Sequence, residues 1–597
     1  MKTKLSGILT LLLAFVVQMT FAQERTITGT VSDESGPLPG VSVLIEGTTS
    51  GTETDFDGNY AIEAKSGDVL RYSFVGMTTV TKTVGADSSI NVTMVSEANT
   101  LDEVVLTAFG LEVKKDDDLS SSTAVEPDVI TRSGESGLIQ GLAGKTSGLK
   151  ITRSSGDPGA GAYIQIRGQN TITGSSSPLI VVDGVPVSNT NVGGGTAGVT
   201  QQSRLNDFNP EDIAKVTVLK GAAAAAVWGT GAANGAIIIQ TKKGMKGKMS
   251  VDFTSAVSYD KINVEFEKQS EFGQGYPNWW LGIGDDYSSE GGRYVPNTGF
   301  SWGDRISGRS GAPNGVVVGN QRFESNTGNI IYPFDSNPDG TVAKNDTNVY
   351  NDSNRNQVFG NGTTYNLGAS ISYANENSNT FLSVANWDQK GIIKGRSSYN
   401  RSNLRLNHTV QLTEKFGASM RASYAFIRSD RIQQGSNLQG LYLGYLRTSP
   451  DFDNRDYKGT YYDSNNVPTP NSHRGYRNYL GSGAPTYNNP GWTINEQDNP
   501  NVVNRFNFAP ELTYDFSDNI KLTARYGLDY YTDNRETFFP VNSAAGNQIG
   551  IYQQDNITEK TENWNFFLQG VHDISDNFSF DWIAGTAFDQ NEYARLS

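Results

Sequence analysis

Apolar and polar residues alternate along several segments of the chain between residues 246 and 597. In the segment 365–373, for example, tyrosine, leucine, alanine and isoleucine share one face, and asparagine, glycine and serine share the other. The same pattern recurs at residues 506–516, 520–530 and 578–588. A strand of about ten residues with one apolar and one polar face is the repeating unit of a transmembrane β-barrel, although soluble β-sandwiches also alternate. The pattern therefore predicts an antiparallel β-sheet. The connections between its strands decide whether it belongs to a membrane barrel or to a soluble sandwich.

Short turns and long polar loops alternate between these predicted strands. The short turns lie at residues 375–379, 413–415, 517–519 and 575–577, and the longer connections lie at residues 261–363, 390–398, 429–504 and 534–561. Short turns on one side and long loops on the other are typical of a bacterial outer-membrane barrel. The pattern therefore predicts such a barrel over residues 246–597.

About nine such strands fit between residue 246 and the end of the sequence. An odd number leaves the last strand pointing outward, so residues 591–597 are predicted to begin an outer loop. Single-chain bacterial barrels have an even number of strands, and plugged ones have about 22. We therefore expect the sequence to hold the N-terminal part of a truncated barrel, which on the order of 500 further residues would close.

The N-terminus has the pattern of a secretory signal peptide over residues 1–22. Two lysines precede an apolar core at residues 9–17, and Ala22 completes a cleavage motif before Gln23. The apolar core is shorter than the roughly 18 residues that a membrane helix needs. We therefore expect cleavage after Ala22 and a mature protein that lies outside the cytoplasm.

Residues 23–96 alternate with a period of two between turn signals. The turns include residues 36–40 and 55–59, in which glycine, proline and aspartate supply the backbone conformations and local hydrogen bonds of tight turns. Short strands separated by such turns predict one small β-sandwich.

Residues 123–245 are rich in glycine and alanine. A run of five alanines, followed by three spaced glycines, separates two β-like runs at 216–219 and 236–241, so backbone can pack closely against backbone. A short helix is predicted at 138–143, with further strands at 149–152, 163–167 and 179–182. The segment is predicted to be a compact α+β domain around one small mixed sheet. Such a domain followed by membrane-type hairpins has the order of a plug followed by a barrel.

Residues 97–122 connect the sandwich to the plug and contain one short extended stretch at 102–110, DEVVLTAFG. The stretch is either an interdomain linker or a docking strand that a partner's sheet edge captures by β-addition. Its place immediately before the plug favours the docking strand.

The composition excludes several classes of function. The net charge of −15 argues against a nucleic-acid partner, because phosphate binding needs a basic surface. The absence of cysteine excludes disulfides and thiolate metal sites. The three histidines (His408, His473 and His572) are far apart, and the sequence has no HExxH or GxSxG motif. We therefore do not expect an enzyme.

One loop has the spacing of a calcium site. The stretch 335–346 places Asp335, Asn337, Asp339 and Asp346 at positions 1, 3, 5 and 12, with glycine at position 6. Calcium loops use oxygen ligands at these positions, although glutamate is usual at position 12. The alternative is an ordinary surface loop, in which Asn, Asp and Gly are common. Calcium is therefore the one cofactor that the sequence indicates.

Another loop, 276–287, is rich in aromatic residues, among them Tyr276, Trp279 and Trp280. Such rings could stack on the sugar rings of a ligand, or they could pack against neighbouring loops. These three residues are the candidate ligand contacts.

Several stretches resemble a known family. GTVSD, PLPGVSVLIEGT, TDFDGNYAI and LRYSFVGM resemble the carboxypeptidase-regulatory-like domain, which implies a binding or spacer module without peptidase chemistry. LAGKTSGLKI, SGDPGAGAYIQIRG, PLIVVDGVPV and VLKGAAAAAVWGTGAANGAIIIQTKKG resemble the plug of the SusC/RagA family of TonB-linked outer-membrane transporters. The order of sandwich, DEVVLTAFG stretch, plug and barrel is also that family's order.

The resemblance implies a role for the extended stretch and for the whole chain. The stretch would be the TonB box, with residues Asp102, Glu103, Val104, Val105, Leu106 and Thr107. The implied function is active import of oligosaccharides or oligopeptides, driven by TonB with ExbB and ExbD, under a SusD-like surface lipoprotein as a lid. The barrel would contact outer-membrane lipid, with the N-terminal domain in the periplasm. The alternative is a non-transporting outer-membrane receptor or adhesin, which would need neither plug nor docking strand.

Overall fold

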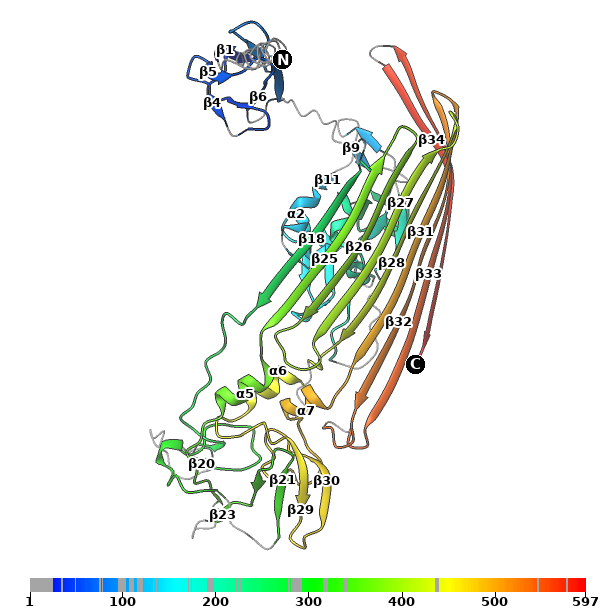
Figure 1. Ribbon diagram of the computed structural model, residues 1–597. Helices are drawn as coiled ribbons and strands as arrows, with labels where there is room; N and C mark the ends of the chain where they lie inside the picture. Colours follow the sequence, from blue (N-terminus) through cyan, green and yellow to red (C-terminus); the bar gives the residue numbers. More distant parts are fainter. Residues whose placement is uncertain are drawn as a thin grey trace, which may run out of the picture. The chain divides into compact units, whose positions relative to one another are not determined.

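The computed structural model of the chain (Figure 1) describes residues 25–33, 36–48, 50–74, 77, 79–94, 104–106, 112–114, 122–132, 134–135, 137–169, 171–172, 174–189, 198–221, 224–225, 228–245, 247, 249–277, 280, 292–314, 320–336, 342–434, 440–544, 547–575 and 578–597. Internal contacts divide the chain into two units, residues 1–105 with 112–118, and residues 106–111 with 119–597. Each unit is described by itself.

The N-terminal domain is a sandwich of two four-stranded sheets. Its strands are β1 (Arg25–Asp33), β2 (Gly36–Pro37), β3 (Ser42–Ile45), β4 (Gly51–Glu53), β5 (Asn59–Ala64), β6 (Val69–Ser73), β7 (Val80–Thr83) and β8 (Val92–Thr93). One sheet has the order β2-β1-β5, with β8 also on β1, and the other has the order β4-β3-β6-β7. Alternate residues of β5, among them Tyr60 and Ile62, are buried between the sheets, as the period of two predicts.

The plug has a five-stranded mixed sheet in the order β11-β16-β17-β14-β15. Its elements are β11 (Ser122–Val125), α2 (Pro127–Thr131), α3 (Leu138–Gly141), β12 (Leu149–Arg153), β13 (Ala162–Ile166), β14 (Leu179–Val182), β15 (Val185–Val187), η3 (Arg204–Asp207), η4 (Pro210–Asp212), β16 (Ile213–Leu219), η5 (Thr230–Ala232) and β17 (Ala236–Thr241). β14 runs parallel to β17, and the other pairs are antiparallel. One detail of the prediction was wrong: β12 and β13 pair with each other in a separate two-stranded sheet.

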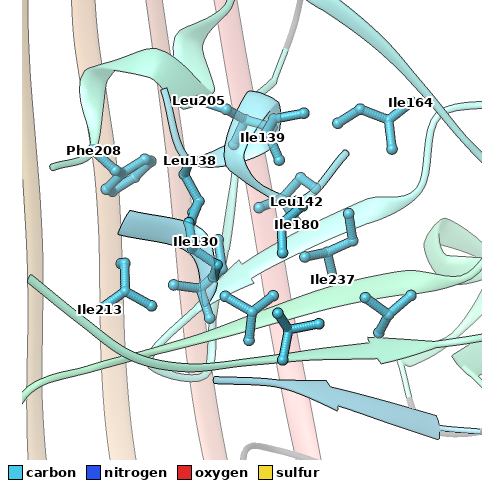
Figure 2. Packing of buried hydrophobic residues seen from close by; sticks show 14 of the residues in the cluster. Ile130, Leu138, Ile139, Leu142, Ile164, Ile180, Leu205, Phe208, Ile213 and Ile237 are labelled. Carbon is cyan, nitrogen blue, oxygen red and sulfur yellow. The ribbon is translucent and has the colours of Figure 1, made fainter. Parts of the chain in front are cut away.

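The plug core lies between this sheet and the short helices. Figure 2 shows Ile130 of α2 and Leu138 and Ile139 of α3 packing towards Ile180 and Ile237 of the sheet. All five side chains are buried. Because β14 and β17 are covered on both sides, they consist of nearly continuous apolar residues instead of alternating ones.

Nine antiparallel strands form the large sheet of the second unit, each paired with the next (Figure 1). They are β18 (Ser250–Asp260), β25 (Gly362–Ala374), β26 (Ser378–Lys390), β27 (Ser398–Gln411), β28 (Phe416–Asp430), β31 (Pro500–Ser517), β32 (Ile520–Phe539), β33 (Ile551–Ser575) and β34 (Phe578–Leu596). The number of strands agrees with the prediction. The outer loop predicted to begin at residue 591 was wrong, since β34 stays paired with β33 as far as Leu596.

The two faces of this sheet have opposite character. On β25, Tyr365, Leu367 and Ile371 are exposed on the outward face, while polar and small residues point to the plug. An exposed apolar face on a long antiparallel sheet is the lipid-facing surface of a membrane barrel. The protein is mainly β, and the sheet is part of such a barrel. None of the described helices is long and apolar enough to cross a membrane.

The long connections 261–361 and 431–499 fold together into a layer of their own. Their elements are β19 (Gly275–Tyr276), β20 (Arg293–Tyr294), η6 (Ile306–Gly308), β21 (Arg322–Ser325), β22 (Ile330–Ile331), β23 (Asp335–Ser336), β24 (Val342–Ala343), α5 (Asn351–Val358), α6 (Leu441–Arg447), β29 (Lys458–Tyr462), β30 (Pro468–His473) and α7 (Pro490–Asn495). β21 pairs with β29, and the buried Asp451 binds Arg309 at 2.9 Å and Lys344 at 3.4 Å. Burial would raise the pKa of Asp451, but Lys344 and Arg309 lower it to about 2. The two long loops are therefore held together by charge as well as by a strand pair.

Candidate functional site

One plug segment that meets the barrel sheet is the short turn η3 (Arg204–Asp207), whose four residues are all buried. The turn begins at Ser203, whose Oγ accepts a hydrogen bond from the Leu205 N–H at 3.2 Å. The last carbonyls of such a turn have no partner within it. Here they point at the sheet, so side chains of the barrel can bind them.

Three successive inward residues of β27 bind these carbonyls. The Tyr399 hydroxyl donates to Asn206 O at 3.1 Å, and Arg401 Nη1 donates to the same oxygen at 2.6 Å. Asn403 Nδ2 donates to Asp207 O at 2.7 Å. The barrel therefore holds the turn through the turn's backbone carbonyls, independently of the turn's own side chains.

Arg505 of β31 joins two plug segments to the barrel. Its Nε and Nη2 donate to the carboxylate of Asp529 on β32 at 2.8 and 2.7 Å. Its Nη1 donates to Arg204 O at 2.6 Å, and Nη2 donates to Ser188 O at 3.0 Å. Asp529 in turn accepts from the Ser188 N–H at 2.8 Å. One buried ion pair of the barrel thus binds both the turn and the residues after β15.

A further arginine, Arg405 of β27, lies between two plug carboxylates. Its Nη1 is 3.6 Å from Asp183 Oδ2, and its Nε is 3.5 Å from Asp212 Oδ2. Farther along the chain, Ser188 Oγ donates to Glu559 Oε2 at 2.7 Å. Seven of the inward residues of β27 to β33 that bind the plug are called the plug seat here: Tyr399, Arg401, Asn403, Arg405, Arg505, Asp529 and Glu559.

The chemistry of the plug seat suits a contact that is firm and yet reversible. Removing one partner of a buried ion pair costs about 3–5 kcal/mol, because the other charge is left without compensation. When both surfaces are polar, however, water can replace their hydrogen bonds as they separate, which an apolar core does not allow. The seat can therefore hold the plug and also release it.

Sequence reasoning did not find the plug seat. The signal was present in the alternation: Tyr399, Arg401, Asn403 and Arg405 occupy alternate positions of one strand and so share its inward face. A row of long polar side chains on an inward face indicates a bound object inside the barrel.

The structure describes the centre of the predicted TonB box. Val104–Leu106 form β9, which pairs with β10 (Glu112–Lys114) in a two-stranded sheet. Asp102, Glu103 and Thr107 lie outside the described residues. An extended backbone is what β-addition requires, and the docking role stays a prediction.

Two of the three candidate aromatic residues lie together in the loop layer. The rings of Tyr276 and Trp280 are stacked, with centroids 6.4 Å apart and planes 9° apart. Phe300 lies 5.2 Å from Tyr276, and Trp280 is 61% exposed. Trp279 lies outside the described residues. The rings pack against one another and still present an open surface, so ligand stacking stays a prediction.

The calcium prediction also stays untested. Asp335 begins a two-residue strand that pairs with Val342–Ala343, and Asp346 Oδ1 accepts a hydrogen bond from the Asn348 N–H at 3.0 Å. Asn337 and Asp339 lie outside the described residues. Among the residues that are described, no group of three or more metal-binding side chains is present.

An α+β plug held against the inward face of a membrane-type antiparallel sheet defines a plugged outer-membrane barrel protein. Residues 27–106 match the family described as CarboxypepD_reg-like domain, and residues 114–236 match the TonB-dependent Receptor Plug Domain. The predicted resemblance to SusC/RagA transporters is confirmed, and the chain has the N-terminal and plug domains of a TonB-dependent receptor.

Two relatives carry names of this class. TonB-dependent receptor P26 of Formosa agariphila is 29% identical over 94% of this chain and 49% of its own length. TonB-dependent receptor SusC of Bacteroides thetaiotaomicron is 36% identical over 49% of this chain and 27% of its own. The chain thus spans about half the length of the first relative, and its match to the second is shorter.

Among solved structures, the chain is similar to the RagAB peptide importer in its closed-closed state. The TM-score is 0.57 at 16% identity, over 79% of this chain and 49% of that one. The open-open state of the same importer gives a TM-score of 0.57 over 83% of this chain and 53% of that one. At this identity the similarity concerns the fold alone.

Proposed function

We propose that the chain works in TonB-dependent import across the outer membrane, with oligosaccharides or oligopeptides as cargo. The observation that carries the proposal is a plug bound by a reversible polar seat, preceded by a short extended strand. The outer membrane offers no ATP, so a plugged barrel needs energy from a partner that pulls on the plug. TonB, with ExbB and ExbD, is that partner in the proposal.

The connection between strand and plug supports this route for the force. β9 (Val104–Leu106) precedes β11 (Ser122–Val125), which is the edge strand of the plug sheet and pairs with β16 (Ile213–Leu219). A pull on an edge strand can remove its hydrogen bonds one after another, which takes less force than shearing the whole sheet at once. The force would therefore reach the plug sheet at its edge.

The environment and the other partners complete the proposal. TonB-dependent receptors are β-barrel proteins of the outer membrane, and the exposed apolar face of β25 to β32 suits lipid. The N-terminal sandwich lies in the periplasm, where TonB can reach β9. Similarity to SusC and to the RagAB peptide importer supports a SusD-like surface lipoprotein as the lid. A nucleic-acid partner is not part of the proposal.

A proline in the docking strand tests the proposal. Val105→Pro removes one N–H and restricts φ, so it should damage strand pairing with TonB more than Val105→Ala does. We expect the affinity of a purified periplasmic TonB domain to fall by at least about tenfold for the proline variant. Uptake of fluorescent malto-oligosaccharides and of a labelled peptide mixture should fall to the level of a TonB-deficient strain.

Binding at the cell surface separates this result from misfolding. Because β9 lies ahead of the plug, Val105→Pro should leave surface binding of the same probes intact. Normal uptake by the proline variant, or loss of surface binding together with uptake, would contradict the proposal. Unchanged binding with no uptake in either the original or the variant protein would favour a receptor or adhesin.

A further inference from the structure

The inward face of the nine-stranded sheet has two different parts. Toward β33 it carries the ionic side chains of the plug seat. On β25 and β26, no described inward residue is charged: Gly362, Thr364, Asn366, Gly368, Ser370, Ser372 and Ala374 on β25, and Asn379, Phe381, Ser383, Ala385, Trp387 and Gln389 on β26. We call this second set the uncharged wall. Both sets face the plug, so their difference bears on how the plug moves.

The plug stands away from the uncharged wall. A cavity of about 370 Å³ separates the two, lined by Ala214 and Lys242 of the plug and by Gly368 and Ser370 of the wall. A second cavity, of about 470 Å³, lies nearer the loop ends of the same strands, between Gln140 of the plug and Thr364, Trp387 and Gln389. Both spaces exceed the size of single waters.

At the plug seat the surfaces are close. The pocket between β14–β15 and strands β27 to β32 measures only about 20 Å³. A methyl group added to Gly527 of β32 would come within 2.5 Å of Val185 Cγ1, whereas one added to Gly368 of β25 would meet nothing nearer than 3.7 Å. The plug is therefore packed tightly on one side and loosely on the other.

The difference also appears within a single row of cross-strand partners. Gly368, Ala385, Asn403 and Ala425 are cross-strand partners in a row from β25 to β28. Asn403 donates to Asp207 O of the plug, while Gly368 and Ala385 line the cavity of about 370 Å³. Within one row of paired residues the plug thus touches β27 and leaves space beside β25 and β26.

The bonds that cross to this side are hydrogen bonds with uncharged groups of the barrel. Ser383 Oγ donates to Asp212 Oδ1 at 2.6 Å, and the Met245 N–H donates to Ser372 Oγ at 2.8 Å. Asn379 Nδ2 donates to Gly244 O at 2.7 Å and Asn379 Oδ1 accepts from the Gly244 N–H. Breaking a hydrogen bond whose groups become hydrated costs less than separating a buried ion pair.

We propose that the cargo passes between the plug and strands β25 and β26, while the plug seat keeps hold of the plug's other side. This inference rests on the proposed function and adds the place at which the passage for the cargo opens. The small hydroxyl and amide side chains of β25 and β26 leave room and offer a polar oligomer many weak hydrogen bonds. The charged groups that line the cavity belong to the plug (Glu211, Asp212, Lys242 and Lys243) and to β18 (Asp252). The plug tilts away from the uncharged wall and does not leave the barrel.

Thiol labelling in living cells tests the passage without knowledge of the cargo. The 597 residues contain no cysteine, so an introduced cysteine is the only thiol among them, and the parent protein without the substitution gives the background of labelling. Ala385→Cys on the uncharged wall is matched by Ala425→Cys on β28, which occupies the same row. Ser370→Cys and Ser423→Cys form a second matched pair, related through Ser383 and Arg405. The probe is a membrane-impermeant biotin–poly(ethylene glycol)–maleimide added outside, with labelling normalised to the denatured protein.

We expect TonB to raise the labelling rate about tenfold at residues 385 and 370, and less than about twofold at 425 and 423, relative to a TonB-deficient strain. A rise confined to residues 425 and 423 would overturn the inference and leave the proposed function standing. An equal rise at all four would mean that the plug leaves as a whole, which also overturns it. No rise at any position would count against the proposed function itself.

Discussion

The uncharged wall and the plug seat are built on the same strand geometry, and yet they treat the plug differently. Both consist of alternate residues that face inward from neighbouring antiparallel strands. At the seat, Arg401 and Arg505 reach across to backbone carbonyls of η3. On the wall, Gly368 and Ser370 stop short and leave a cavity of about 370 Å³. Alternation decides which side chains face the plug, and their length and charge decide whether they hold it.

The comparison also separates two kinds of stabilisation. The ion pairs that cross from the plug to the seat, such as Asp207 with Arg505 at 3.4 Å and Asp212 with Arg405 at 3.5 Å, are costly to break on one side alone, because a charge is left buried. The hydrogen bonds at the uncharged wall join groups that water can satisfy once they part. A moderate force should therefore open the wall side first. Three sets of substitutions test this difference. Each is read as the urea concentration at which Ala425→Cys or Ala385→Cys becomes labelled in isolated outer membranes.

The largest effect is expected at Arg505. Arg505→Met leaves Asp529 buried without its partner and also removes the donors to Arg204 O and Ser188 O. We expect the free energy that holds the plug on its seat to fall by about 3–5 kcal/mol. The readout is labelling of Ala425→Cys at a lower urea concentration.

The double variant Arg505→Met/Asp529→Leu controls for the stranded charge. It should recover part of the loss, since neither charge then remains buried alone. If the single variant changed the free energy by less than about 0.5 kcal/mol, a range typical of surface substitutions, the seat would not hold the plug.

A smaller effect is expected from a matched pair of glycines. Gly527→Ala places a methyl group 2.5 Å from Val185 Cγ1 and should weaken the seat by about 1–3 kcal/mol through overpacking. Gly368→Ala meets its first neighbours at 3.7 Å and should change the same free energy by less than about 0.5 kcal/mol. Equal effects at the two positions, measured by labelling of Ala425→Cys, would show that the plug is packed alike on both sides.

The smallest effect is expected at Ser383. Ser383→Ala removes the hydrogen bond to Asp212 Oδ1, while Arg405 still lies 3.5 Å from Asp212. The cost should be about 1 kcal/mol and should appear as earlier labelling of Ala385→Cys, with Ala425→Cys unchanged. Ser370→Ala, on the neighbouring strand, is the control and should have no measurable effect. A shift at Ala425→Cys instead would contradict the division of the inward face.

Much of the fold follows from local pattern. The period of two predicted the sandwich, the nine barrel strands and the faces of β25, because each of these depends only on alternation and on turn residues. Sequence similarity to known plugs then identified the domain between them. The alternation also placed Arg401 and Arg405 on an inward face, although their role as a seat was not recognised.

Other features depend on distances between elements that are far apart in the sequence. The pairing of β12 with β13 outside the main plug sheet, and the extension of β34 to Leu596, are decided by which partner strand lies within hydrogen-bond reach. The contacts of the barrel's inward face with the plug also depend on such distances. Ala385 and Asn403 are both inward and at one height, and only the position of η3 decides that Asn403 binds the plug while Ala385 lines a cavity. Alternation is a property of one strand, whereas clearance is a property of two surfaces, so tertiary structure alone sets where the plug is held and where it can part from the wall.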